Sequence, residues 1–132
     1  MSTNVLILPA YEFYLNGEWK ESQSGQTIDI KSPYLHEIIG KVQAITKEEV
    51  DEAICSAHKA QKKWAETSLQ QRANYLYKWA DELVNMQDEI AEVIMQEVGK
   101  SLKDSKNEVV RTADFIRYTV EEALHMHGES MK

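Results

Sequence analysis

The strongest constraint on the fold of this chain is a change of sequence pattern at Thr46. Before Thr46, apolar and polar residues alternate over short stretches, as in half-buried strands, whereas after it apolar residues recur every three or four positions, as in amphipathic helices. Thr46-Lys47-Glu48-Glu49 marks the change, because threonine followed three residues later by glutamate forms a capping box at a helix start. The sequence therefore predicts an α+β chain, with a β arm over residues 12–45 and helices over residues 46–132.

The predicted β arm consists of a hairpin and further strand segments. Asn16-Gly17 predicts a type I′ turn, because both residues tolerate positive φ angles and β-favouring aromatic residues flank them. Residues 27–31 alternate apolar and polar side chains, and residues 38–45 form a further strand that Gly40 weakens or bulges. Residues 1–11 are expected to be a flexible lead-in with room for one more short strand.

Three amphipathic helices are expected over residues 46–65, 68–98 and 102–127. Ser68-Leu69-Gln70-Gln71 gives the second helix a capping box, and Gly99 provides its stop. The third helix has a serine-to-glutamate signature that begins at Ser105, but a start one turn earlier, at Ser101, stays open. Gly128 is expected to end the third helix.

The third predicted helix has two faces that both require neighbours. One face carries the apolar residues Val109, Ala113, Ile116, Val120 and Leu124. The opposite face carries Arg111, Phe115, Tyr118 and Glu122. Because an ordinary surface helix has a single apolar stripe and a polar face, the arginine between aromatic residues predicts contact with a ligand, with a further part of a larger protein, or with a partner chain.

Arg111 is the candidate functional residue of that second face. A guanidinium group binds phosphate or carboxylate through a rigid pair of donors. The alternative is an ion pair with Glu108 or Asp114, each one helical turn away. The spacing alone favours the ion pair and leaves anion binding open.

The other candidate residues favour structural interpretations. Cys55 lies within a predicted helix and is expected to be a buried or half-buried structural cysteine, although His58 could reach it as an activating base. His125 and His127 lie two positions apart on a helix and so point apart, which argues against a shared metal ion. His36 belongs to a loop and forms no catalytic pattern. The chain also lacks both the G-x-G-x-x-G motif and the P-loop.

Charge and hydropathy exclude several classes of partner. The net charge is −7 and no Lys/Arg cluster occurs, so neither nucleic acid nor an anionic membrane surface is an expected partner. No apolar run approaches the ~18 residues of a membrane-spanning helix. A single cysteine and the absence of a secretory signal favour the cytoplasm.

Four short motifs, in this order, resemble the N-terminal segment of the aldehyde dehydrogenase superfamily. They are Tyr14-Leu15-Asn16-Gly17-Glu18-Trp19, Ser32-Pro33, Thr46-Lys47-Glu48-Glu49-Val50 and Glu97-Val98-Gly99-Lys100. The stretch from Glu108 to Asp114, followed by Tyr118 and by Glu121 to Leu124, resembles one branch more narrowly. That branch is the NADP-dependent, non-phosphorylating glyceraldehyde-3-phosphate dehydrogenases. The resemblance covers about residues 12–132.

The resemblance implies a fold, a reaction and a role for Arg111. The chain would be part of the α/β NAD(P)-binding domain of a cytoplasmic, homo-oligomeric oxidoreductase, a dimer or tetramer. That enzyme oxidises the glycolytic intermediate glyceraldehyde 3-phosphate to 3-phosphoglycerate and reduces NADP. The arginine that matches Arg111 helps hold the substrate phosphate, so the resemblance reverses the preference for an ion pair.

The chain departs from the family in its length. Family members are several times longer, and their nucleophilic cysteine, activating glutamate, oxyanion asparagine and cofactor loop match positions beyond residue 132. We therefore expect an inactive fragment with no catalytic or cofactor-binding residue of its own, and Cys55 does not match the nucleophile. Two alternatives stay open: another aldehyde specificity, such as succinic semialdehyde or lactaldehyde, and a stand-alone, non-catalytic helical interaction module.

Overall fold

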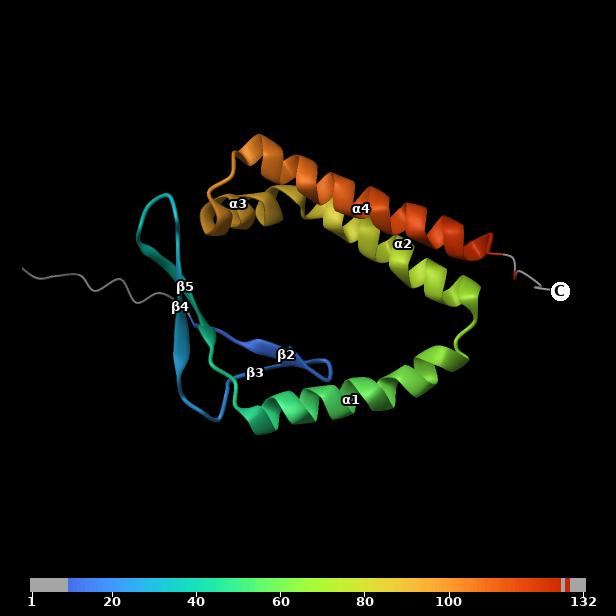
Figure 1. Cartoon of the computed structure of the whole chain (residues 1–132), viewed down its shortest axis with the longest axis horizontal. Helices are drawn as coiled ribbons and strands as arrows, with labels where there is room; N and C mark the ends of the chain where they lie inside the picture. The colour runs from blue at the N-terminus through green and yellow to red at the C-terminus, as the bar shows by residue number, and fades with distance from the viewer. Residues whose placement is uncertain (1–9, 127, 129–132) are drawn as a thin grey trace, which may run out of the picture. The chain divides into compact units, whose positions relative to one another are not determined.

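The computed structural model describes residues 10–126 and 128, which form five strands followed by four helices (Figure 1). The strands are β1 (Ala10–Tyr11), β2 (Phe13–Leu15), β3 (Glu18–Lys20), β4 (Thr27–Lys31) and β5 (Ile38–Gln43). The helices are α1 (Lys47–Glu66), α2 (Leu69–Asn85), α3 (Gln87–Val98) and α4 (Leu102–Leu124). The predicted α+β class is confirmed. The chain divides into two compact units, one of residues up to 62 with 96–99, the other of residues 63–95 with those from 100 onward.

The first unit contains a hairpin and a three-stranded sheet. The hairpin pairs β2 with β3, and Asn16 and Gly17 at its turn have φ angles of 57° and 86°, as the Asn-Gly signal predicts. The rings of Tyr14 and Trp19 face each other across it, with centroids 5.2 Å apart. In the sheet, β5 lies between β1, to which it is parallel, and β4, to which it is antiparallel.

Gly40 is needed where β1 approaches β5. The last two residues of the expected lead-in form β1, whereas residues 1–9 lie outside the described residues. A Cβ at Gly40 would lie 3.3 Å from the ring of Tyr11, so glycine leaves the room that this ring occupies. The pairing register of β4 and β5 shifts beside this position, between Ile30 and Lys31, as the predicted interruption at Gly40 requires.

Glu49 fastens the start of α1 to the loop after β3. The predicted capping box is present, because the Glu49 N–H donates to Thr46 Oγ1 at 3.2 Å and the Thr46 N–H donates to Glu49 Oε2 at 2.7 Å. The same carboxylate also accepts bonds from Ser22 Oγ at 2.7 Å and from the Gln23 N–H at 2.8 Å. Glu49 is buried, and these donors, led by the Thr46 N–H, lower its pKa from 4.5 to about 2.

This shift predicts an acid-sensitive contribution of Glu49 to stability. A carboxylate whose pKa is lowered by folding stabilises the folded state above its unfolded pKa, and the contribution is lost as the pH falls through the folded pKa. We expect Glu49→Gln to be less stable than the unchanged chain at pH 7, and the difference to shrink between about pH 4.5 and about pH 2. Urea unfolding across that range measures it, with exposed Glu52→Gln as the control. A difference that is constant with pH would contradict the assignment.

The second unit is organised around α2 and α4, which run side by side (Figure 1). Its fully or almost fully buried apolar residues are Ala73, Ala80, Ala91, Val109, Ala113 and Val120. Small side chains at these positions allow two helices to approach closely. The apolar face predicted for the third helix is therefore confirmed as the side of α4 that forms this core.

The single helix predicted over residues 68–98 is wrong, because it is two helices that separate at Met86. The Met86 N–H donates to the carbonyls of Glu82 and Val84, which closes α2, and α3 begins at the next residue. Gln87 Nε2 donates to the carbonyl of Lys106 on α4 at 3.2 Å. The apolar period continues through this point without glycine or proline, so tertiary contact with α4 rather than a local signal accompanies the break. Four helices, not three, follow the β arm.

The ends of α4 differ in part from the prediction. Ser101, rather than Ser105, is the N-cap, since its Oγ accepts a bond from the Asp104 N–H at 3.1 Å. The helix ends at Leu124 and not at residue 127, because the His125 N–H turns back onto the carbonyls of the last helical turn. His127 lies outside the described residues.

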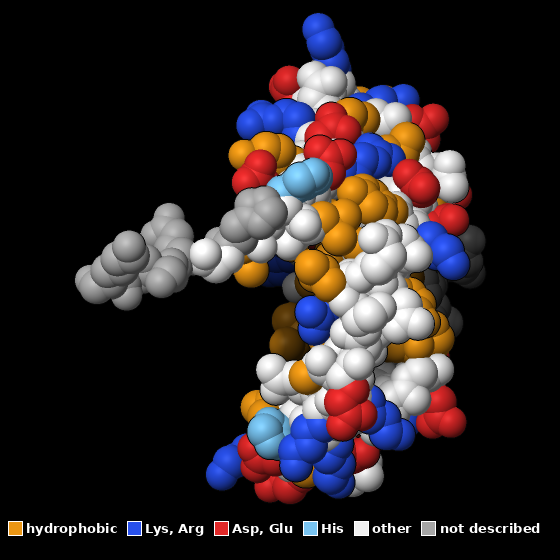
Figure 2. Space-filling model, turned by 90° about the vertical axis from the view of Figure 1, so that its right-hand side faces the viewer, with side chains coloured by type: hydrophobic (Ala, Val, Ile, Leu, Met, Phe, Trp, Pro, Cys, Tyr) orange, Lys and Arg blue, Asp and Glu red, His pale blue; other side chains and the backbone are white. Residues whose placement is uncertain are grey.

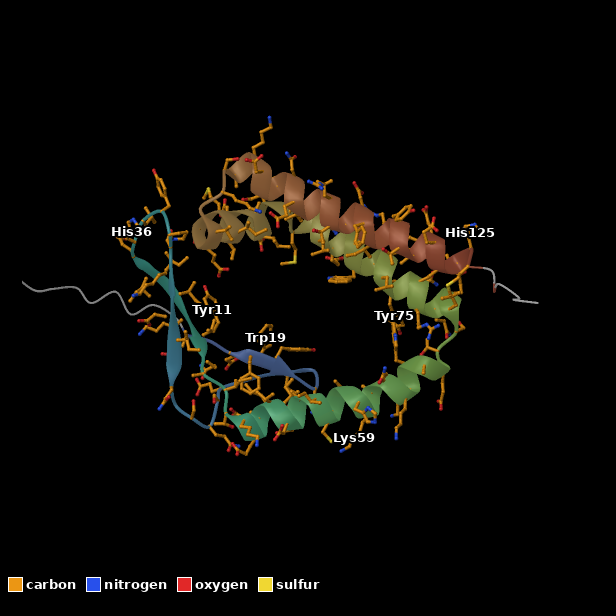
Figure 3. All side chains as sticks on the ribbon, in the orientation of Figure 1. Tyr11, Trp19, His36, Lys59, Tyr75 and His125 are labelled. Atoms are coloured by element: carbon orange, nitrogen blue, oxygen red, sulfur yellow. The ribbon has the colours of Figure 1, made fainter. Side chains whose placement is uncertain are left out.

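Many large hydrophobic side chains are exposed, and Figure 2 shows orange side chains at the surface among charged ones. Tyr75 and Trp79 on α2 are 60% and 54% exposed, although aromatic residues at helical spacing are typical of a helix's core or boundary (Figure 3 labels Tyr75). None of the helices in residues 10–126 has the length and hydrophobicity that crossing a membrane requires.

Candidate functional site

The exposed side of α4 forms the candidate site. The helix is capped by Ser101, and its opposite side, which carries Val109, Ala113 and Val120, is buried. This packing turns Arg111, Phe115 and Tyr118 outward, as the helical period predicts. Phe115 is 70% exposed and Tyr118 is 60% exposed.

These side chains line an open, shallow pocket along α4. Its lining residues are Lys100, Asp104, Asn107, Glu108, Val110, Arg111, Thr112, Asp114, Phe115 and Tyr118. A guanidinium group beside two aromatic surfaces offers both charge-assisted donors and apolar contact. Arg111 can therefore offer charge-assisted donors to an anionic group, in a lining that also carries the carboxylates of Asp104, Glu108 and Asp114.

The carboxylates next to Arg111 pair with other cations. Glu108 forms an ion pair with Lys100. Asp114 Oδ1 lies 3.2 Å from Arg117 Nη1, and the other terminal nitrogen of Arg117 lies 2.8 Å from Asp81 Oδ1 on α2. The hydrogen bond to Asp81, opposed by desolvation and supported by Asp114, raises the pKa of Arg117 above its ordinary value. Within residues 10–126, none of the ion pairs includes Arg111, so the ion pair that the spacing favours is not formed.

None of the other sequence candidates in the described residues lines this pocket. Cys55 is exposed on α1, so the expectation of a buried or half-buried cysteine is wrong. The reason is that α1 buries Glu49, while Ile54, next to Cys55, is itself 63% exposed. His36 lies in the loop between β4 and β5, and His125 follows α4 with its Nδ1 2.8 Å from the Glu121 carbonyl oxygen (Figure 3).

A metal centre finds no support among these residues. In the described ranges, 10–126 and 128, no three histidine, cysteine or acidic side chains gather closely enough to hold a metal ion.

Sequence reasoning did not identify Lys100 and Arg117 as residues that pair with the carboxylates near Arg111. Lys100 lies eight positions from Glu108 and Asp81 lies on a different helix from Arg117, so neither pair has a local sequence signal.

Comparison with known proteins identifies the fold to which this site belongs. The sequence pattern of the aldehyde dehydrogenase family matches residues 19–132. The chain belongs to the aldehyde dehydrogenase family. Three of the four ordered motifs, from Ser32-Pro33 to the Glu97–Lys100 stretch, lie within the matched residues, in agreement with the resemblance.

Individual relatives place the chain within this family. It is 41% identical over 126 residues to the NADP-dependent glyceraldehyde-3-phosphate dehydrogenase of Triticum aestivum, covering 96% of this chain and 25% of that protein. The enzyme of the same name from Streptococcus equinus is 41% identical over 122 residues, which are 92% of this chain and 25% of that protein. The chain therefore spans about a quarter of the length of the curated relatives it matches.

A solved structure agrees with the described fold of this aldehyde dehydrogenase chain. The NADP-dependent glyceraldehyde-3-phosphate dehydrogenase of Bacillus halodurans C-125, complexed with NADP, superposes with a TM-score of 0.88 at 42% identity. The match covers 93% of this chain and 26% of that one. The strands and helices described above are accordingly those of the matching part of an aldehyde dehydrogenase.

Proposed function

We propose that the intact protein is an NADP-dependent glyceraldehyde-3-phosphate dehydrogenase, in which this chain supplies the arginine that binds the substrate phosphate. The intact enzyme would oxidise the aldehyde to 3-phosphoglycerate, with water as the source of the added oxygen and bound NADP supplying the hydride acceptor. The proposal rests on Arg111, which is exposed, lines the same pocket as Phe115 and Tyr118, and takes part in none of the described ion pairs. The enzymes of that name from Triticum aestivum and Streptococcus equinus, each 41% identical to this chain, support it.

Within this proposal, Arg111 has a positioning and a selective role. Its planar guanidinium group can donate two parallel hydrogen bonds to phosphate oxygens. That interaction holds the far end of a three-carbon substrate, so the aldehyde is presented to the reacting groups in a fixed orientation. Phe115 and Tyr118 line the same pocket, where they would meet the rest of the catalytic domain or the carbon chain of the substrate.

The residues described here do not fit NADP itself. A pyrophosphate commonly binds at a glycine-rich turn that leads from a strand to an open helix N-terminus. In the described residues the strand-to-helix junction runs from β5 to α1, and its residues Ala44-Ile45-Thr46 include no glycine. The Glu49 carboxylate already accepts the Thr46 N–H at this helix start. We therefore propose that groups outside this chain bind NADP in the intact enzyme.

Other properties of the intact enzyme stay predictions. A homo-oligomer, a dimer or tetramer, is the expected assembly, and the cytoplasm is the expected location, where the reaction would accompany glycolysis. The alternative of a stand-alone, non-catalytic helical module makes a different prediction, since such a module would have no counterpart of the remaining three-quarters of the relatives' length.

A substrate panel on the intact enzyme tests the proposed specificity. We expect NADP reduction with glyceraldehyde 3-phosphate at a kcat/KM at least about 100-fold above that with glyceraldehyde, because one arginine–phosphate interaction is worth ~1.5–3 kcal/mol and further contacts add to it. Succinic semialdehyde and lactaldehyde complete the panel. A preference for either of these over the phosphorylated substrate would assign Arg111 to a carboxylate or a structural partner instead.

A further inference from the structure

The two carboxylates one helical turn from Arg111 form ion pairs with other cations. On a helix, Arg111 lies one turn from both Glu108 and Asp114, a spacing at which arginine and carboxylate ordinarily pair. Both carboxylates are nevertheless engaged elsewhere, Glu108 by Lys100 and Asp114 by Arg117. An Arg111 paired with either carboxylate would have to give up that pair before it could bind a phosphate.

The competing cation Arg117 is held in place from a second helix. Its Nη2 lies 2.8 Å from Asp81 on α2, while Nη1 lies 3.2 Å from Asp114 on its own helix. Its side chain is only 34% exposed, against 66% for each carboxylate. Because the guanidinium group is planar and rigid, contact with Asp81 fixes the orientation in which the second nitrogen meets Asp114.

We propose that Arg117, anchored by Asp81, is a positioning residue that holds Asp114 away from Arg111 and so keeps the Arg111 guanidinium group free for the substrate phosphate. Lys100 acts in the same way on Glu108. This inference rests on the proposed phosphate role of Arg111. It adds that phosphate affinity depends on residues that never contact the substrate.

The test compares the intact enzyme with its Arg117→Gln variant on glyceraldehyde 3-phosphate and on unphosphorylated glyceraldehyde. The released Asp114 then pairs with Arg111 and competes with the phosphate. We expect KM for the phosphorylated aldehyde to rise about two- to fivefold, the size of one exposed ion pair. KM for glyceraldehyde should stay within measurement error.

Second-site variants separate competition from a loss of charge or of structure. Asp114→Asn added to Arg117→Gln removes the competing carboxylate and should restore the original KM. Glu121→Gln, which neutralises an exposed acid further along α4, restores the same net charge but leaves Asp114 in place, so it should not restore KM. Rescue by both variants would overturn the proposal in favour of a general charge effect.

An Arg111→Ala variant, measured in parallel, distinguishes a failure of the proposed phosphate role of Arg111 from a failure of the proposed positioning role of Arg117. If Arg111→Ala raises KM selectively for the phosphorylated aldehyde but Arg117→Gln does not, the positioning role is wrong and the phosphate role stands. If Arg111→Ala has no selective effect, both are wrong. Arg117→Gln could instead raise KM for both aldehydes, without rescue by Asp114→Asn. That result would show that Arg117 only links α2 and α4 structurally, and it would contradict the positioning role.

Discussion

Replacing Arg111 with alanine in the intact enzyme is expected to raise KM for glyceraldehyde 3-phosphate by about 10- to 100-fold, since a hydrogen-bonded contact with a charged group contributes ~1.5–3 kcal/mol. KM for unphosphorylated glyceraldehyde should change little, because that substrate has no group for Arg111 to hold. Steady-state kinetics on both substrates measures the effect. Arg111 is exposed on α4, so the substitution removes no core contact and should leave the fold intact.

Lysine at the same position provides the matched comparison. Arg111→Lys keeps the positive charge but has one ammonium group in place of the two-pronged guanidinium group. We expect an intermediate KM for the phosphorylated substrate, between the arginine enzyme and the alanine variant. Equal losses on both aldehydes in the alanine variant would contradict the phosphate assignment and favour a structural role for Arg111.

The second large effect is expected at the contact between α2 and α4. Ala113 on α4 and Ala80 on α2 are both fully buried, so the helices approach closely where these side chains lie. Ala113→Leu adds three carbons where no space exists, and overpacking of this kind costs ~1–3 kcal/mol. Urea unfolding of the 132-residue chain should show a correspondingly lower midpoint.

The same substitution at an exposed site controls for the change of side chain itself. Ala60 lies on α1 and is exposed, so Ala60→Leu should alter the free energy of unfolding by only a few tenths of a kcal/mol, the difference in helix propensity. If Ala113→Leu and Ala60→Leu had equal effects, the close packing of α2 against α4 would be in doubt.

Local signals made much of the fold predictable. Asn16-Gly17 gave the hairpin because its backbone angles depend on these two residues alone. Thr46 and Ser68 gave helix starts because each hydroxyl bonds an N–H only three residues away. The outward position of Arg111 followed from the helical period.

Features that depend on distant residues were not predictable. The break at Met86 has no glycine or proline, and Gln87 contacts a carbonyl nineteen residues away on α4. The pair between Arg117 and Asp81 joins residues thirty-six positions apart. Without these contacts, the sequence indicated one long helix and an ion pair at Arg111.

The exposure of apolar residues was also not predictable from periodicity. An apolar side at helical spacing indicates which face of a helix is to be covered, but not whether the covering residues belong to the same stretch of chain. Ile54 and Trp79 are therefore exposed although their spacing is that of core residues. Since the matched relatives are about four times longer than this chain, we expect further parts of the intact enzyme to cover these faces.

A structure of the intact enzyme with bound 3-phosphoglycerate would show whether Arg111 holds the substrate phosphate. We expect phosphate oxygens about 3 Å from the Arg111 guanidinium nitrogens, the distance of a charge-assisted hydrogen bond. It also predicts that Arg117 still bridges Asp81 and Asp114, as it does here. A phosphate held by other residues, with Arg111 paired to Asp114 or Glu108, would contradict the account.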